Sequence, residues 1–168
     1  STVSDSSVFS NPLLQNVYEM GSIIKPLTMA AALDAGKIRP TTLYDDEGTV
    51  QVEKSVISNY DGKARGRVSM QEVLNKSLNT GMVFVMKSMG RNLFADYMKR
   101  YGLGEKTGID MPQEIAGLTR NLNSPRDVEH ATAAFGQGIA LTPIATIRAL
   151  AALGNGGYLV QPYLTDSI

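Results

Sequence analysis

The sequence contains no cysteine among its 168 residues. A disulfide, a thiolate metal site and a cysteine nucleophile are therefore excluded. Histidine is nearly absent as well, since His130 is the only one. A Ser-His-Asp triad would have to use this residue, and its neighbours Glu129 and Ala131 give no indication of such a role. A lone histidine is more often structural, and we expect this of His130.

Long apolar runs and an excess of charge of one sign are also missing. No stretch of 18 or more apolar residues occurs, so we expect no segment of this sequence to span a membrane. Residues 1–7 are polar and do not resemble a signal peptide, so the targeting segment of an exported protein would lie outside this sequence. The 16 basic and 16 acidic residues give a formal net charge of zero. This balance argues against nucleic acid or an anionic membrane surface as the main partner.

The residues that are present are sufficient for a folded unit. Hydrophobic residues make up 43% of the sequence, which is enough for a core. A chain of this length forms one domain or a piece of one. We find no internal repeat and no linker that would separate two domains.

The stretch from residue 18 to residue 36 organises the rest of the chain. An alanine-rich run that ends at Gly36 predicts a helix over about residues 22–35. Pro26 is tolerated only near the start of a helix, where its missing N–H is not needed. Ser22 and Lys25 therefore lie in or beside the first turn, on one face of the helix. Free N–H groups and the helix dipole favour a developing alkoxide or oxyanion there.

Ser22 and Lys25 form a candidate catalytic pair. A serine hydroxyl is a weak nucleophile that needs a base within hydrogen-bond reach. Lysine can be that base only where burial or positive neighbours keep it neutral. The pair also has an ordinary explanation, because a Ser-x-x-Lys tetrad occurs by chance roughly once in a chain of this length. Ser22 would then be a helix cap and Lys25 a solvated side chain.

The remaining sequence predicts helices separated by loops and short strands. Residues 1–17 are expected to be irregular, and residues 37–68 to form loops and short strands with a small hairpin. Ser69 and Glu72 fit a capping box for a helix over 70–76. The later elements that we expect are helices over 82–90 and 91–101, a mostly irregular stretch over 102–127, a short helix between Pro125 and Phe135, a helix capped by Thr142, and the start of a strand at 158–160.

A second candidate motif, Ser77-Leu78-Asn79, lies in a predicted break between two helices over residues 77–81. A hydroxyl in such a break can relay a proton between a nucleophile and a leaving group. An amide there can hold Lys25 in place or bind a substrate carbonyl. The ordinary explanation of this motif is a helix cap.

In this order, the two motifs resemble the active site of the penicillin-binding protein and serine β-lactamase superfamily. The surrounding residues extend the resemblance to the class B penicillin-binding proteins, over residues 9 to 164. The segments that carry it are Asn11-Pro12, Tyr18 to Pro26, Ser69 to Gly81, Tyr101 to Pro112, Phe135 to Gly138, Leu141 to Pro143 and Asn155 to Gly157.

Three features depart from the family pattern. Met20 stands where the family usually has the proline of Glu-Pro-Gly-Ser, and Gln113 stands where it often has the glycine of Pro-Gly-Glu. Lys106-Thr107-Gly108 is not the counterpart of the family's catalytic Lys-Thr-Gly, which lies on a sheet strand after the Asn-Gly-Gly turn. We therefore expect residues 1–168 to be a partial transpeptidase domain that ends before that strand.

The resemblance implies an α/β parent fold of the β-lactamase/transpeptidase type. This chain would be its mostly α part, with short strands and little of the sheet. The implied function is that of a peptidoglycan D,D-transpeptidase in cell-wall synthesis, located outside the cytoplasm and anchored through a segment absent from this sequence. D-Ala-D-Ala stem peptides would be its substrates and β-lactams its acylating ligands. Other proteins of cell-wall synthesis or division are candidate partners, and no metal or organic cofactor is implied.

The resemblance also implies roles for four residues. Ser22 would attack the peptide carbonyl and form an acyl-enzyme, and Lys25 would accept its proton. Ser77 would relay the proton, and Asn79 would orient Lys25 and the substrate amide. A class A β-lactamase fits less well, because we find no deacylating-glutamate motif.

Two alternatives come from other classes of protein. The first is a non-catalytic homologue with a structural or partner-binding role, which the absence of the third motif supports. The second is an unrelated helical binding protein, for which each motif would have only its ordinary explanation.

Overall fold

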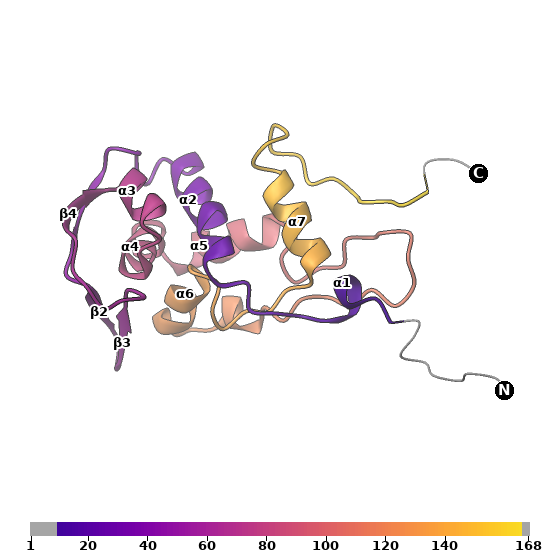
Figure 1. Ribbon diagram of the computed structural model, residues 1–168, viewed down its shortest axis with the longest axis horizontal. Helices are drawn as coiled ribbons and strands as arrows, with labels where there is room; N and C mark the ends of the chain where they lie inside the picture. The colour runs from indigo at the N-terminus through magenta and orange to yellow at the C-terminus, as the bar shows by residue number, and fades with distance from the viewer. Residues whose placement is uncertain (1–9, 166–168) are drawn as a thin grey trace.

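A computed structural model describes residues 10–165, so the first part of the stretch expected to be irregular lies outside the described residues. From residue 10 on, that expectation is wrong in part, because a short helix, α1 (Pro12–Gln15), follows Asn11. The Asn11 side chain accepts a hydrogen bond from the N–H of Leu13 at 3.0 Å, which is a helix-capping contact. Figure 1 shows paired strands at one end, helices in the middle and α7 toward the other end.

The helical core is built around α2 (Lys25–Asp34), which packs on α4 (Asn79–Met89) and α5 (Arg91–Arg100). Leucine, methionine and phenylalanine side chains fill the space between these helices. The most deeply buried of them are Leu27, Met82, Met86, Phe94 and Met98. The methionines of α4 and α5 thus serve as core filler between the helices.

A 3₁₀ turn, η2 (Gly21–Ile24), leads directly into α2. Pro26 lies in the first turn of α2, as its missing N–H requires. The helix ends at Asp34, and Gly36 adopts a left-handed φ of +64°, which is the usual way for a helix to stop. The helix predicted over 22–35 is thus confirmed, with its first turn wound more tightly.

Residues 43–69 form two nested antiparallel pairs of strands. The outer pair joins β1 (Leu43–Asp46) to β4 (Gly66–Ser69), and the inner pair is the hairpin of β2 (Thr49–Val52) and β3 (Ser55–Ser58). The short strands and the hairpin expected here are confirmed. Ser69 then starts α3 (Met70–Asn75) with the predicted capping box to Glu72.

The second half of the chain folds back onto the core. It contains η3 (Arg120–Asn123), α6 (Asp127–Ala133) and α7 (Pro143–Ala151), which Thr142 caps as predicted. Isolated bridges join Tyr18 to Leu141 and Leu118 to Ala140. The first bridge lies just before η2, so it ties the entry into α2 to the segment that leads into α7.

Two expected element boundaries are wrong. Asn79 begins α4 instead of lying in a break, because the chain turns sharply enough at Ser77 and Leu78 for the next helix to start. The segment 158–160 forms no strand. Its backbone has no neighbouring strand to pair with among residues 10–165, and β propensity alone does not supply a partner.

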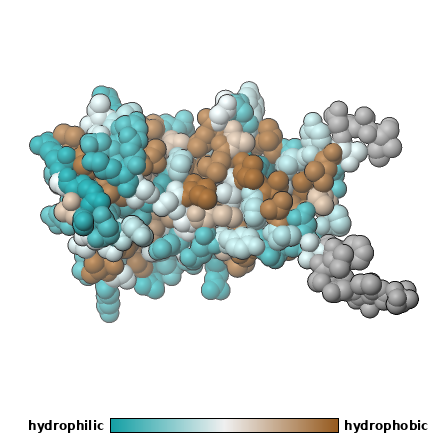
Figure 2. All heavy atoms as spheres, in the orientation of Figure 1, coloured by the Kyte–Doolittle hydropathy of each residue, from teal (hydrophilic) through white to brown (hydrophobic). Residues whose placement is uncertain are grey.

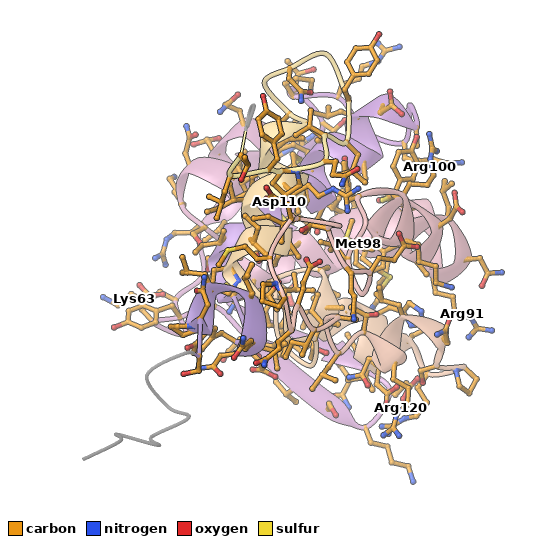
Figure 3. The ribbon with its side chains drawn as sticks, turned by 90° about the vertical axis from the view of Figure 1, so that its right-hand side faces the viewer. Lys63, Arg91, Met98, Arg100, Asp110 and Arg120 are labelled. Carbon is orange, nitrogen blue, oxygen red and sulfur yellow. The ribbon has the colours of Figure 1, made fainter. Side chains whose placement is uncertain are left out.

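The surface separates into charged and apolar regions. Figure 3 shows that Arg91, Arg100 and Arg120 project outward while Met98 lies among the helices. Figure 2 shows hydrophobic side chains gathered over α7 and the segment after it. Exposed members of this group are Ile147, Leu153, Val160 and Leu164. Within residues 10–165, no helix has the length and apolar character needed to cross a membrane.

Candidate active site

Lys25 occupies the centre of the candidate site, at the start of α2. The residue is only 1% exposed, because it enters the space between α2 and the loop before α4. Its Nζ donates to the carbonyl oxygen of Ser77 at 2.6 Å, to Ser77 Oγ at 2.9 Å and to Asn79 Oδ1 at 2.8 Å. These contacts use all three donors of an ammonium group.

Ser77 is aimed at Lys25 by the way in which α3 ends. Its φ of +54° is left-handed, which is uncommon for a residue other than glycine. The N–H of Ser77 donates to Leu74 O at 3.1 Å, and the N–H of Leu78 donates to Val73 O at 3.0 Å. This is the hydrogen-bond pattern of a Schellman motif with serine in the position that glycine usually occupies.

Ser22 completes a line of three side chains. It lies in the tight turn before α2 and is exposed. Ser77 Oγ lies 3.2 Å from Ser22 Oγ and is the donor in that hydrogen bond. The Ser22 hydroxyl is therefore connected to the Lys25 amine through the Ser77 hydroxyl. A proton can move along such a line in two short transfers.

Asn79 uses the two ends of its amide for different partners. Its Oδ1 accepts from Lys25, and its Nδ2 donates to the carbonyl oxygen of Ser58 at 3.0 Å. Ser58 is the last residue of β3, so the hairpin takes part in fixing this amide. Sequence reasoning did not identify Ser58, because a backbone carbonyl leaves no signature in the sequence.

The Ser22 turn is held in place by a loop from the second half of the chain. The N–H of Gly21 donates to Gly136 O at 3.1 Å, and the N–H of Gly138 donates to Glu19 Oε1 at 2.9 Å. The segment from Phe135 to Gly138 was among those that carry the family resemblance. Its structural role here is to hold both sides of the turn that carries Ser22.

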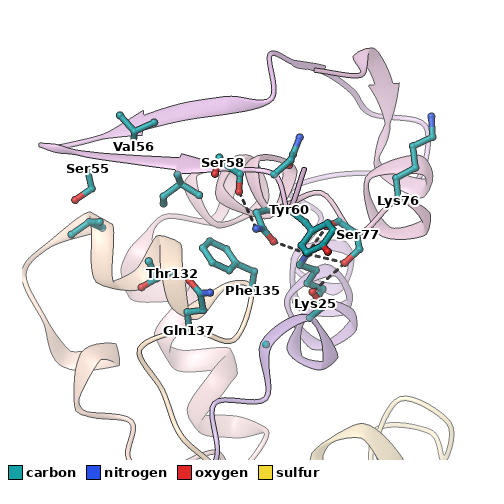
Figure 4. Close-up of a pocket in the computed structure, with 16 residues that line it drawn as sticks. Lys25, Ser55, Val56, Ser58, Tyr60, Lys76, Ser77, Thr132, Phe135 and Gln137 are labelled. Atoms are coloured by element: carbon teal, nitrogen blue, oxygen red, sulfur yellow. Dashed lines mark hydrogen bonds between the residues drawn. The ribbon is translucent and has the colours of Figure 1, made fainter. Parts of the chain in front are cut away.

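These side chains open into a cleft with a volume of about 730 Å³. In Figure 4, the hairpin with Val56 and Ser58 forms one wall, Phe135 and Gln137 lie opposite, and Lys25 and Ser77 lie at one end. The lining is mostly polar or small near Ser22 and includes the apolar side chains of Val56, Val128 and Phe135 farther along. An extended peptide or a small acylating ligand fits a cleft of this size.

Burial lowers the pKa of Lys25 from 10.5 to about 8. Taking the ammonium out of water disfavours its charged form, and this desolvation outweighs the three hydrogen bonds that favour it. At pH 7 roughly one Lys25 side chain in ten is then neutral and able to accept a proton. Lysine thus meets the condition for a base that the sequence alone could not test.

The lowered pKa also predicts how stability depends on pH. Between about pH 8 and 10 the unfolded chain holds a proton on Lys25 that the folded chain has released, so stability should rise with pH. Relative to a Lys25→Met variant, we expect the free energy of unfolding of the wild type to increase by about 2–3 kcal/mol over this range. Urea denaturation of both proteins at a series of pH values measures the difference.

Comparing the wild type with Lys25→Met cancels the effect of Tyr101, which changes stability with pH in the opposite direction. Burial raises the pKa of Tyr101 to about 12, so its unfolded form loses a proton first, and the stability of both proteins falls above about pH 10. A difference between the two proteins that stays constant from pH 7 to 10 would contradict a lowered pKa of Lys25.

The structure brings together all four candidate residues of the sequence analysis and leaves the others apart. Ser22, Lys25, Ser77 and Asn79 line one cleft. His130 is buried, and its ring nitrogens lie 3.0 and 3.3 Å from the carbonyl oxygens of Arg126 and Leu122. The prediction that it is structural agrees with these contacts.

Lys106-Thr107-Gly108 belongs to a loop outside the cleft. There Thr107 donates to Glu114 through both its backbone N–H and its hydroxyl, each at 2.6 Å. Among residues 10–165, no group of three histidine, aspartate or glutamate side chains could hold a metal ion.

The fold and the geometry of the cleft define a class of protein. An exposed serine at the start of a buried helix, connected through a second serine to a buried amine of lowered pKa, is an arrangement for nucleophilic acyl transfer without histidine. In such an arrangement the amine is placed where it can take the part that the imidazole has in the Ser-His-Asp triad.

Comparison with known proteins identifies the family. Residues 2–168 match the family model "Penicillin binding protein transpeptidase domain", and the chain belongs to this family. It is 36% identical to stage V sporulation protein D of Bacillus subtilis over 95% of its own length. It is 29% identical to the peptidoglycan D,D-transpeptidase FtsI of Escherichia coli over 88%. These alignments cover 25% and 24% of the two relatives, so the chain spans about a quarter of the curated proteins that it matches.

Solved structures agree with this assignment and with the expected α/β parent fold. A peptidoglycan glycosyltransferase from Burkholderia ambifaria superposes with a TM-score of 0.88 at 27% identity. The TP domain of Burkholderia pseudomallei penicillin-binding protein 3 superposes with a TM-score of 0.87 at 26% identity. The matches cover 95% and 96% of this chain but 50% and 48% of the other two. The half of these structures that the chain matches is mostly helical in this chain, with only small sheets.

Proposed function

We propose that this chain carries the nucleophilic part of a peptidoglycan D,D-transpeptidase that acts through a serine acyl-enzyme. The observation that carries the proposal is the line from Ser22 Oγ to Ser77 Oγ at 3.2 Å and on to Lys25 Nζ at 2.9 Å. The names of the relatives support the same reaction, because FtsI of E. coli is a peptidoglycan D,D-transpeptidase. The substrates would be stem peptides that end in D-Ala-D-Ala.

The acylation step follows from the hydrogen bonds around Lys25. Neutral Lys25 keeps two N–H donors, for Ser77 O and Asn79 Oδ1, and its lone pair accepts the proton of Ser77 Oγ. Ser77 Oγ in turn takes the proton of Ser22 while Ser22 Oγ forms its bond to the substrate carbonyl carbon. When the amide C–N bond breaks, the leaving D-alanine amine receives a proton from Lys25 by the same route.

The second step regenerates the serine. The amino group of another stem peptide attacks the ester carbonyl, and the bond to Ser22 Oγ breaks. The attacking amine gives up a proton, and Ser22 takes one back through Ser77. A β-lactam would open its ring on Ser22 in the first step. The expelled ring nitrogen would stay tethered to the acyl group and keep the second amine out of the cleft, so the ester would persist.

We also propose that residues 1–168 are part of a larger transpeptidase domain, which acts outside the cytoplasm on the outer face of the membrane. The shares of the solved structures that are covered, 50% and 48%, support a larger domain. The apolar side chains over α7 support it too, because such a surface is usually covered.

Intact-mass spectrometry after incubation with benzylpenicillin tests the proposed reaction. We expect one adduct with the full mass of the antibiotic, since ring opening releases no fragment, and peptide mapping should locate it on Ser22. Ser22→Ala should give no adduct. The same measurement on the full-length protein shows whether the rest of the domain is required. Folded full-length protein that takes up no penicillin, or takes it up equally after Ser22→Ala, would overturn the proposal.

A further inference from the structure

A buried carboxylate lies behind the wall of the cleft, at the end of β1. Asp46 is 1% exposed, and no lysine or arginine within residues 10–165 forms an ion pair with it. Its oxygens accept from Gly48 N at 3.1 Å, Asn59 Nδ2 at 2.9 and 3.0 Å, Arg65 N at 3.0 Å and Thr80 Oγ1 at 2.7 Å. Hydrogen bonds alone therefore hold the carboxylate in place, and hydrogen bonds to a carboxylate are strong.

Asp46, Asn59 and Thr80 form a closed cluster. Asn59 Oδ1 accepts from the N–H of Thr80 at 3.3 Å and lies 3.0 Å from Thr80 Oγ1. Asn59 and Thr80 are only 3% and 0% exposed. The cluster joins three segments that are far apart in the sequence: the end of β1, the residue after β3 and the first turn of α4.

The cluster is connected to the candidate site by sequence neighbours. Asn59 follows Ser58, and Thr80 follows Asn79. The Asn79 amide donates from Nδ2 to Ser58 O at 3.0 Å and accepts at Oδ1 from Lys25 at 2.8 Å. Two successive residues at the end of the hairpin, Ser58 and Asn59, thus hold two successive residues at the start of α4. A planar amide fixed at Nδ2 in this way can present only its oxygen to Lys25.

We propose that Asp46, Asn59 and Thr80 are positioning residues for acylation, which act by keeping the hairpin and the start of α4 in register so that Asn79 Oδ1 faces Lys25. This inference rests on the proposed function of Ser22. When the cluster is broken, the Asn79 amide can rotate and turn its NH₂ group toward the Lys25 amine. Lys25 then loses one of its three acceptors. Its amine shifts, and the hydrogen bonds that connect it through Ser77 to Ser22 are no longer aligned.

The charges around Lys25 make this effect measurable. Besides Lys25, the titratable side chains that line the cleft are Tyr60 after β3 and Lys76 at the end of α3, which pairs with Glu72 at 3.3 Å. None of them forms a hydrogen bond with Lys25. A change in the proton affinity of Lys25 should therefore report on the acceptors that the cluster positions.

Thr80→Val tests the proposal, because valine has the shape of threonine without the hydroxyl. We expect the rate of penicillin acylation per folded molecule to fall by roughly tenfold to a hundredfold, and the acid limb of its pH profile to move to lower pH. Thr80→Ser keeps the hydroxyl and should restore most of the rate. Thr146→Val removes a buried hydroxyl of α7 that donates to the carbonyl oxygen of Thr142, the residue that caps this helix, and it should leave the profile unchanged.

Two further measurements keep the proposal testable. Asp46→Asn should also lower the acylation rate and the Lys25 pKa, as Thr80→Val does. The new asparagine would turn an NH₂ group toward donors that bind a carboxylate oxygen in the wild type. NMR titration of the Lys25 side chain measures its pKa without any acylation, so it tests the cluster even if wild-type protein takes up no penicillin and the proposed function fails. An unchanged Lys25 pKa in folded Thr80→Val and Asp46→Asn proteins, with an unchanged pH profile in proteins that acylate, would overturn the proposal.

Discussion

Replacing Lys25 with methionine will reduce the rate of penicillin acylation at Ser22 by roughly 10²–10⁴-fold, the usual contribution of a general base. Methionine fills a similar space in the interior but has no lone pair that can take a proton from Ser77. The nucleophile itself remains in place, because its turn is held by backbone hydrogen bonds, from Gly21 N–H to Gly136 O and from Lys25 N–H to Ser22 O, which the substitution keeps. Stopped-flow measurement with a fluorescent penicillin gives the rate.

A second substitution at the same position separates charge from proton transfer. Lys25→Arg keeps a cation, but a guanidinium does not lose its proton in proteins and cannot act as the base. We therefore expect it to acylate as slowly as Lys25→Met. Lys87→Met serves as the matched control, since Lys87 is an exposed lysine near the end of α4. Acylation by Lys25→Arg at a rate close to that of the wild type would mean that the positive charge is needed and the base is not.

The part of the site that sequence could predict is the part set by local spacing. Ser22 and Lys25 lie one turn apart at the start of a helix whose proline and closing glycine can be read directly. The capping box of Ser69 and Glu72 is similarly local, since both partners lie within four residues. Short-range steric and hydrogen-bond rules decide such features before any tertiary contact forms.

The rest of the site depends on contacts between distant segments. Ser77 reaches Lys25 because α3 ends in a left-handed residue, and a serine in place of glycine gives no such signal. The contact of Asn79 with Ser58 and that of Thr80 with Asp46 span 21 and 34 residues. Residue type alone does not show which aspartate is buried and holds the cluster. Asp46 is buried because one strand pair is nested inside another.

The same reasoning explains the wrong boundary at α4. Asn79, Thr80 and Gly81 have low helix propensity, and this favours a break in the chain. In the fold, Asn59 accepts the N–H of Thr80, one of the donors that a first helical turn leaves free. Gly81 lies so close to Val73 that an added Cβ would lie 2.8 Å from Val73 Cγ2. Tertiary packing thus outweighs local propensity here, and the helix begins three residues early.

Substituting Gly136 with alanine will have the largest effect on the fold of the site. Gly136 has a φ of +79° and its carbonyl accepts from Gly21, the residue before Ser22. A Cβ added to Gly136 would press into the carbonyl oxygen of Gly21 and lie 2.7 Å from its nitrogen. Backbone atoms cannot move aside as a flexible side chain can, so the Ser22 turn itself has to shift.

We expect Gly136→Ala to lower the free energy of unfolding by about 2–5 kcal/mol, the sum of the left-handed backbone cost and the overpacking cost. Urea denaturation measures this loss, and the acylation rate of the folded fraction should also fall by roughly a hundredfold because Ser22 moves relative to Ser77. Gly36→Ala is the matched control, since Gly36 has a φ of +64° with nothing within 4 Å of an added Cβ. It should cost only about 1–2 kcal/mol and leave acylation unchanged. If the two variants were equally stable and acylated equally fast, the contact between Gly136 and Gly21 would not be what holds the Ser22 turn in place.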